Sequence, residues 1–347
     1  MKRIGILTGG GDAPGLNAVI RAVTVKGIKD GYEVIGFRYG WAGPMKKDYV
    51  PLTLADVEDI HRQGGTILGS SRTNPAKVEN GLQIVKDNLE QLDLYALIAS
   101  GGEDTLGVAN KLSKIGAKVV GVPKTIDNDI SATDYTFGFD TAINRVMEAL
   151  DRLHTTARSH QRVIVVEIMG RHSGWMTLYG GMAGGAHLIL VPEVEFTLQQ
   201  VYDFVNKRYS EGKTYALIAL AEGAKCPELV REVEKEAPRD AFGHILATKV
   251  KRPIAQVLAE KIEEATGKET RHAVLGHLQR GGDPSAFDRV LATRLGFKAM
   301  EMVEQGEFGK MAALRGEEIV SVSLEKAVGK LKVVDRSRYE LAQVFFG

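Results

Sequence analysis

The sequence predicts an α/β protein of two lobes, each a mostly parallel sheet flanked by helices. Short apolar runs alternate with stretches of helical periodicity along almost the whole chain, which is typical of parallel α/β layering. The runs fall into two groups, and the length of 347 residues exceeds that of one ordinary domain. Paired glycines follow several runs directly, as expected of ligand-binding loops at the carboxyl ends of strands.

The expected strands of the first lobe are residues 3–7, 33–37, 94–99 and 118–121, and those of the second are 162–168, 187–191, 215–221 and 272–275. Between the groups, Ala142, Val146, Leu150 and Leu153 recur at helical spacing and predict a helix that joins the lobes. We expect one lobe to hold residues 1–138 and about 284–332, and the other to hold 139–283 and about 333–347. The charge-dense stretch 226–240 reads as an exposed excursion.

Composition excludes several classes of function. The formal net charge of +1 gives no general field for nucleic acid or an anionic membrane, so an anion site must be built locally. No apolar run approaches the length of a spanning helix, and no secretory signal precedes the first expected strand. A single cysteine, Cys226, excludes an internal disulfide and fits a reducing compartment, so we expect a cytoplasmic protein.

Two glycine-rich loops follow expected strands of the first lobe. The loop around Gly9, Gly10 and Gly11 leads into a helix and predicts a phosphate cradle, although a tight turn without ligand fits the loop alone equally well. It is neither a Walker loop nor a dinucleotide fingerprint, because no Lys-Ser or Lys-Thr closes it and Pro14 replaces the third glycine. After the second loop, Glu103 and Asp104 could hold Mg²⁺, with helix capping as the alternative.

A third loop combines Lys124, Thr125, Asp127, Asn128 and Asp129 directly after a strand. This mixture suits phosphoryl transfer, since the lysine neutralises phosphoryl oxygens while a carboxylate accepts a hydroxyl proton. The alternative is an Asx-type turn.

The second lobe contributes cations near strand ends, which we expect to lie at the same edge of the sheet and to clamp a phosphomonoester: Arg162, Arg171, Arg271, His277 and Arg280. Few acidic partners stand near them in the sequence, so we expect these arginines to need an anion. The residues alone thus predict a phosphotransferase, with a polyphosphate and Mg²⁺ on one lobe and a phosphorylated acceptor on the other.

The chain resembles the phosphofructokinase family along essentially its whole length. The matching motifs occur in the family's order: residues 8–15, 69–72, 101–105, 123–129, 169–171, 221–223 and 276–282. The resemblance implies transfer of a phosphoryl group to the C1 hydroxyl of fructose 6-phosphate, in glycolysis or gluconeogenesis. It also implies a homo-oligomer, a dimer or tetramer with shared active sites, in which Arg162 and Arg271 reach in from a neighbouring subunit.

The resemblance further implies a role for each matching residue. Asp127 is expected to be the catalytic base, with Lys124, Asp129 and Arg171 also in the catalytic set. The donor side is implied to comprise Gly11, Arg72, Asp104 and Thr105, with Glu103 as the ligand of Mg²⁺. The sugar phosphate is implied to contact Thr125, Arg162, Met169, Gly170, Glu222, Arg271, His277 and Arg280.

Donor choice is expected to depend on Asp104, where ATP-using relatives tend to have glycine. An aspartate adds bulk and like charge against the α-phosphate of a nucleotide, whereas pyrophosphate ends before that point. Lys124 is also typical of pyrophosphate users, so we expect a pyrophosphate-dependent enzyme. ATP remains the alternative, because Trp41 lies where ATP enzymes often place an aromatic ring near the adenine. A non-catalytic sugar-phosphate sensor is less favoured, since a sensor needs no base.

Regulation is expected to be weak. Allosteric bacterial members carry arginines at the positions of Val25, Leu54, His154 and Glu211, and only Arg21 and Lys213 remain as cations there. We therefore expect a non-allosteric enzyme.

Overall fold

The computed structural model describes residues 2–229 and 252–347. The chain forms two compact units: Met1–Thr141 with Arg280–Lys332, and Ala142–Gln279 with Val333–Gly347. The expected boundaries at residues 138 and 284 lie three and four positions away from these limits. Most of the expected charged excursion, residues 226–240, lies outside the described residues.

The first unit is built on a seven-stranded sheet in the order β11-β10-β5-β4-β1-β2-β3. Its strands are β1 (Arg3–Thr8), β2 (Glu33–Phe37), β3 (Tyr49–Pro51), β4 (Leu94–Gly101), β5 (Val119–Pro123), β10 (Lys310–Arg315) and β11 (Glu318–Ser323). The inner strands run parallel, and only β3 and β11 at the edges pair antiparallel. The prediction of a mostly parallel sheet is confirmed.

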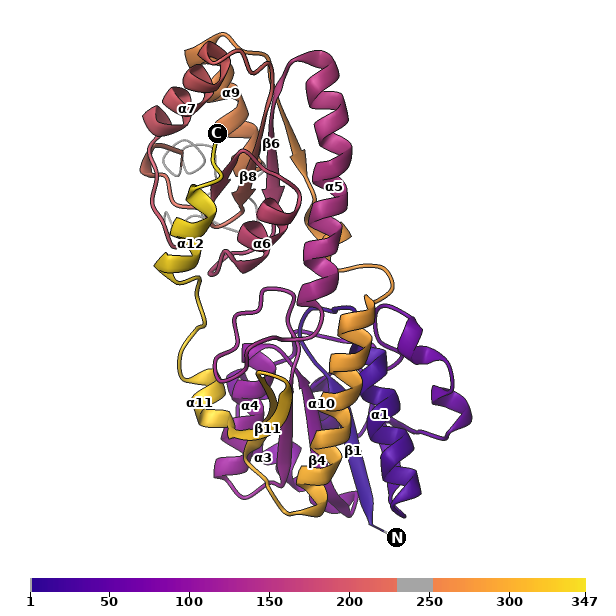
Figure 1. Ribbon diagram of the computed structural model, residues 1–347. Helices are drawn as coiled ribbons and strands as arrows, with labels where there is room; N and C mark the ends of the chain where they lie inside the picture. Colours follow the sequence, from indigo (N-terminus) through magenta and orange to yellow (C-terminus); the bar gives the residue numbers. More distant parts are fainter. Residues whose placement is uncertain (1, 230–251) are drawn as a thin grey trace. The chain divides into compact units, whose positions relative to one another are not determined.

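Helices cover both faces of this sheet. On one face lie α1 (Leu16–Lys29) and α10 (Ala286–Glu304), side by side in Figure 1. On the other lie α2 (Ala42–Lys46), α3 (Gly81–Gln91), α4 (Glu103–Lys114) and α11 (Leu324–Val328). Strand β1 shows why both faces need cover, because Ile4 and Ile6 join the first core while Leu7 joins the second. Short 3₁₀ turns η1 (Ala55–Val57), η2 (Ile60–Arg62) and η3 (Pro75–Lys77) complete the unit.

The second unit has an all-parallel sheet in the order β7-β8-β6-β9. Its strands are β6 (Val163–Ile168), β7 (Leu188–Leu190), β8 (Ala216–Ala221) and β9 (Thr270–Val274). Helices α7 (Leu198–Ser210) and α9 (Ile254–Thr266) pack on one face. On the other, α6 (Trp175–Ala183) lies against the long helix α5 (Phe139–His160), where a Cβ on Gly180 would come 2.6 Å from Val146. The 3₁₀ turn η5 (Gly276–Gln279) follows β9, and α12 (Arg336–Gln343) packs near α6.

All eight expected strands and the joining helix are present, but β3, β10 and β11 were not predicted. Strand β10 reads Lys-Met-Ala-Ala-Leu-Arg, and alanine and leucine favour helices over strands when judged locally. Pairing with β5 and β11 therefore decides its conformation. None of the described helices is both long and apolar enough to cross a bilayer.

The strand order of the first sheet marks a place for a ligand. The chain leaves β1 toward β2 on one side, whereas β4 leads to β5 on the other side. The loops at the carboxyl ends of β1 and β4 thus diverge, which is where open α/β sheets bind ligands.

Candidate active site

Loops from three strands and from the 66–72 segment meet at this edge of the first sheet. The amide of Gly10 donates to the carbonyl of Ser71 at 3.1 Å, and the amide of Lys124 donates to the carbonyl of Gly101 at 3.0 Å. Thr105 lies between two of the loops and is 3% exposed. Its hydroxyl oxygen is 2.6 Å from where a Cβ of Gly9 would lie and 2.5 Å from that of Gly101. Neither glycine can therefore carry a side chain while Thr105 stays in place.

Lys124 brings a buried ammonium to the first glycine loop. Its side chain is 3% exposed, and Nζ donates a hydrogen bond to the carbonyl of Gly11. Burial, followed by the nearby charge of Arg280, lowers the pKa of Lys124 to about 8, while Asp12 and two carboxylates of its own loop oppose the shift. A buried cation of this kind is well placed to meet an anion.

The side chain of Arg280 contacts the same glycine loop. Its Nη1 donates to the carbonyl of Asp12 at 3.2 Å and is 2.7 Å from where a Cβ of Gly11 would lie. Arg280 belongs to the first unit, so its expected place among the cations of the second lobe is wrong, whereas Arg162, Arg271 and His277 belong to the second unit as expected. Two cations, those of Lys124 and Arg280, therefore flank the glycine loop, which favours its reading as an anion site over that of a bare turn.

The loop after β5 is held in shape by its asparagine. Asn128 is buried with φ +50°, and its Oδ1 accepts hydrogen bonds from the amide of Thr136 at 3.1 Å and from Nζ of Lys332 at 2.9 Å. The Asx-like role thus belongs to Asn128. Asp127 and Asp129 are half-buried, and the amide of Asp127 donates to the Thr125 hydroxyl at 3.1 Å. Burial raises the pKa of Asp129, an effect that hydrogen bonds and Lys124 partly offset.

Two carboxylates stand in the first turn of α4. Glu103 and Asp104 are both exposed, and the N-cap residue of the helix, Gly102, provides no side-chain cap. Arg72 is also exposed. Among residues 2–229 and 252–347, no group of three or more His, Cys, Asp or Glu side chains gathers to hold a metal. The described residues therefore build no protein-only metal cage, and a divalent ion here would bind one or two carboxylates together with phosphate oxygens.

The expectation that Trp41 offers an aromatic surface near the adenine position is wrong. Trp41 is 2% exposed and belongs to the core beneath the sheet, so its indole offers no stacking face. The exposed ring is that of Tyr39, which is 54% exposed and has φ +56°. A Cβ on Gly69 would lie 2.8 Å from this ring, and the hydroxyl of Ser71 donates to the Tyr39 carbonyl at 2.7 Å.

In the second unit, loops at the carboxyl ends of β6 and β8 cross each other. Gly170 has φ +139°, and its carbonyl accepts from the amide of Gly223 at 3.2 Å. A Cβ on Gly223 would lie 2.1 Å from the carbonyl oxygen of Arg171, so only glycine fits. The amide of Met169 donates to Oε1 of the buried Gln279 at 3.3 Å, which ties in the turn after β9. Arg171, Glu222 and His277 are exposed at this edge of the sheet.

Arg162 and Arg271 lie at the opposite, amino-terminal edge. Arg162 immediately precedes β6 and Arg271 is the second residue of β9. Six residues of β6 separate Arg162 from Met169, which at about 3.3 Å per residue is roughly 20 Å. The expectation that these arginines share one edge of the sheet with the loop of Arg171 is therefore wrong within a single chain.

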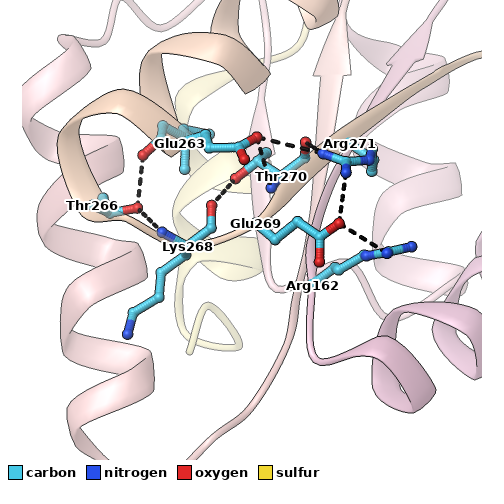
Figure 2. A network of polar contacts seen from close by, with 8 residues as sticks. Arg162, Glu263, Thr266, Lys268, Glu269, Thr270 and Arg271 are labelled. Carbon is cyan, nitrogen blue, oxygen red and sulfur yellow. Dashed lines mark hydrogen bonds and ion pairs between the residues drawn. The ribbon is translucent and has the colours of Figure 1, made fainter.

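The expectation that these arginines lack acidic partners is also wrong (Figure 2). Oε1 of Glu269 pairs with Nη2 of Arg162 at 2.8 Å and with Nη2 of Arg271 at 2.6 Å. Arg271 also pairs with Glu263 at 3.5 Å. The guanidinium of Arg162 lowers the pKa of Glu269, so this carboxylate is ionised at neutral pH.

Comparison with known proteins agrees with these motifs. The sequence profile described as "Phosphofructokinase" matches residues 3–303. The chain belongs to the phosphofructokinase family. A solved relative from Pichia pastoris, a phosphofructokinase in the T-state, superposes with a TM-score of 0.81 at 30% identity. The match covers 99% of this phosphofructokinase and 36% of the yeast chain, so our chain spans about a third of that relative's length.

Curated relatives of this phosphofructokinase carry two kinds of name. A "Pyrophosphate--fructose 6-phosphate 1-phosphotransferase" of Amycolatopsis methanolica is 57% identical over 347 residues, covering 99% of this chain and 100% of the relative. An "ATP-dependent 6-phosphofructokinase 3" of Streptomyces coelicolor is 52% identical over 342 residues, covering 98% and 99%. Overall identity alone therefore separates the two donors only weakly.

Three site residues of this phosphofructokinase escaped the sequence reasoning. Glu269 stands two positions before Arg271, and this spacing in the sequence could have indicated an acidic partner for the arginine. Gln279 lies inside a recognised motif, but only the fold shows that it is fully buried and holds the backbone of Met169. Tyr39 gave no signal, because its exposure follows from a positive φ that aromatic residues rarely adopt.

Proposed function

We propose that this phosphofructokinase transfers a phosphoryl group from pyrophosphate to the C1 hydroxyl of fructose 6-phosphate, reversibly. The names of the relatives support this donor, since those at 53–57% identity are named as pyrophosphate enzymes and those named as ATP enzymes are 47–52% identical. The observation that carries the proposal is the exposed carboxylate of Asp104, one residue before the Thr105 that packs on the glycine loop.

Asp127 is the proposed base. Its carboxylate takes the proton of the C1 hydroxyl while that oxygen attacks phosphorus, and the bond to the leaving phosphate breaks. Thr125 and Asn128 shape the turn that presents it, and Asp129 supports the same loop. Together with Arg171, Glu222 and the backbone at Met169 and Gly170, these are the proposed contacts to the sugar.

Lys124 and Arg280 are the proposed cations around the donor. Both donate hydrogen bonds to carbonyls of the Gly11 loop, so they can neutralise phosphoryl oxygens there. Mg²⁺ would bind through Glu103 and the phosphates, and when bound it supplies charge neutralisation for the transferred group. The exposed carboxylate of Glu103 fits this role, because Mg²⁺ commonly keeps waters and uses one or two protein carboxylates.

Shared active sites are part of the proposal, and the position of the arginines supports them. Arg162 and Arg271 lie roughly 20 Å along β6 from the loop of Arg171, at about 3.3 Å per residue, and this separation favours contributions from two chains to one sugar phosphate. We therefore propose a homo-oligomer in which these two arginines and His277 complete the 6-phosphate site between subunits.

The donor is tested by replacing Asp104 with glycine. We expect Asp104→Gly to lower the KM for ATP by at least tenfold, since removing one misplaced charge typically relieves a penalty of several kcal/mol. The pyrophosphate-dependent rate should change much less. Asp104→Asn is the matched variant, because it keeps the bulk and removes the charge. Donor preference that stays the same in both variants would defeat the argument and favour the ATP-dependent alternative.

Weak regulation and a cytoplasmic location are part of the same proposal. His154 stacks edge-on against His187 and Tyr215, with ring centroids 5.4 and 5.9 Å away, and its Nε2 lies 2.9 Å from the carbonyl of Gly184. These contacts occupy the ring where allosteric relatives have an arginine. Initial rates should change less than twofold on adding ADP or phosphoenolpyruvate. The buried Cys226 fits a reducing compartment.

A further inference from the structure

The carboxylate of Glu269 occupies the position of an anion between two guanidinium groups (Figure 2). A single oxygen, Oε1, lies 2.8 Å from Nη2 of Arg162 and 2.6 Å from Nη2 of Arg271. The two Nη2 atoms are therefore no further apart than the sum of these distances. That spacing suits one phosphate group, whose oxygens accept hydrogen bonds from guanidinium pairs in the same way.

The arrangement is fixed by the strands rather than by chance contact of long side chains. Glu269 directly precedes β9, and its carbonyl accepts from the amide of Val163 at 3.0 Å, while Ile164 is opposite Arg271. Arg162, directly before β6, is thus level with Glu269, and Arg271 stands two residues further along the neighbouring strand β9. The side chain of Glu269 is 39% exposed, so a ligand from solvent can reach it.

We propose that Glu269 is an internal anion that the 6-phosphate of the sugar must displace, and so a residue that sets the affinity for the sugar phosphate. This inference rests on the proposed role of Arg162 and Arg271 as phosphate contacts. Each guanidinium has five N–H donors, and the pairing with Glu269 uses one on each arginine. A phosphate can take over the place of Oε1 without either arginine moving far.

Glu269 acts in two opposing ways. It holds two flexible side chains in register, which reduces the entropy lost when phosphate binds. It also places a negative charge beside a dianion and must give up two ion pairs. Because each exposed ion pair amounts to at most a factor of about five, loss of both predicts a three- to tenfold effect, roughly, on affinity. We expect the charge effect to exceed the ordering effect, since both partners of the phosphate already sit on a rigid sheet.

The test is Glu269→Gln in the intact enzyme, with calorimetric binding of fructose 6-phosphate in the absence of donor and with steady-state kinetics. Glutamine keeps the size and removes the charge, and the backbone pairing with Val163 does not depend on the side chain. We expect the Kd and the KM for fructose 6-phosphate to fall about three- to tenfold. The kcat and the KM for pyrophosphate should stay unchanged, which a general structural effect would not produce.

Two sets of variants make the result unambiguous. Glu263→Gln is the matched control, because Glu263 pairs with Arg271 alone at 3.5 Å, and its effect on Kd should stay below twofold. Glu269→Asp keeps the charge and should bind fructose 6-phosphate nearly as the unmodified enzyme does. A Kd that is unchanged or higher in Glu269→Gln overturns the inference.

Arg162→Ala and Arg271→Ala separate this inference from the proposed function. If both raise the Kd while Glu269→Gln does not lower it, only the role of Glu269 fails. If neither arginine variant changes the Kd, the proposed 6-phosphate site fails and the inference fails with it.

Discussion

The buried ammonium of Lys124 should lower the free energy of unfolding of the enzyme at neutral pH relative to its value at high pH. Burial lowers the pKa of Lys124 from 10.5 to about 8 in the folded chain. A lowered lysine pKa means that the unfolded chain binds more protons than the folded chain between pH 8 and 10.5, so stability rises with pH across that window. Replacing Lys124 with methionine removes this dependence.

The size of the effect follows from the two pKa values. The lowered pKa of Lys124 corresponds to about 3 kcal/mol against the folded state at pH 7, and most of that cost disappears by pH 10. The free energy of unfolding of the unmodified enzyme, minus that of Lys124→Met, should therefore increase by roughly 2 to 3 kcal/mol between pH 7 and pH 10.

Denaturant unfolding of both proteins at several pH values measures this difference directly. Taking the difference cancels groups that the two proteins share, provided that they do not couple to Lys124. Arg280→Met is the companion variant, because the charge of Arg280 is the second cause of the lowered pKa of Lys124. Its loss should raise the pKa of Lys124 toward 10.5 and so narrow the pH range over which stability rises. A difference that stays flat from pH 7 to pH 10 would show that Lys124 is not a desolvated cation, and the proposed neutralisation of the donor would lose its support.

Two further predictions concern residues outside the donor loop. Asp288 is buried, accepts from the amide and hydroxyl of Thr141 at 2.7 and 2.5 Å, and has its pKa raised to about 6 by burial. A raised carboxyl pKa favours the folded state at low pH. The free energy of unfolding of the unmodified enzyme, minus that of Asp288→Asn, should therefore fall by about 2 kcal/mol from pH 4.5 to pH 7. Equal pH profiles of the two proteins in denaturant unfolding would refute this. Gly223→Ala should raise the KM for fructose 6-phosphate at least tenfold and lower the Tm, since its Cβ would come 2.1 Å from the Arg171 carbonyl and overpacking costs about 1–3 kcal/mol. Gly107→Ala is its control, because no atom lies within 4 Å of the added Cβ, and unchanged kinetics in both variants would contradict the role of that loop crossing.

Much of the fold was predictable because the signals are local. Strands buried on both faces read as continuous apolar runs, and glycine loops follow them where the chain turns into a helix. Strands β3, β10 and β11 were not predictable in the same way. Their conformation depends on pairing with distant segments, as for Lys310 and Met311 beside β5.

In the candidate site, too, local features were predictable and contacts between distant segments were not. The sequence identified the loops of Gly11, Lys124 and Arg171 by residue type and order. It misjudged Trp41 and the arginines, because exposure and charge pairing depend on which segments the fold brings together. The pairing of Arg162 with Glu269 joins residues more than a hundred positions apart, and the indole of Trp41 is covered by a core that no local pattern describes.

By itself the sequence determined the chemical groups available to this protein: a base, a lysine, glycine loops and a set of arginines. Tertiary structure alone decided which of those groups are desolvated, which are neutralised by a neighbour, and which end of a strand each occupies. The reason is physical, since burial and Coulomb interaction depend on distances in space, and strand direction fixes those distances only after the sheet has formed.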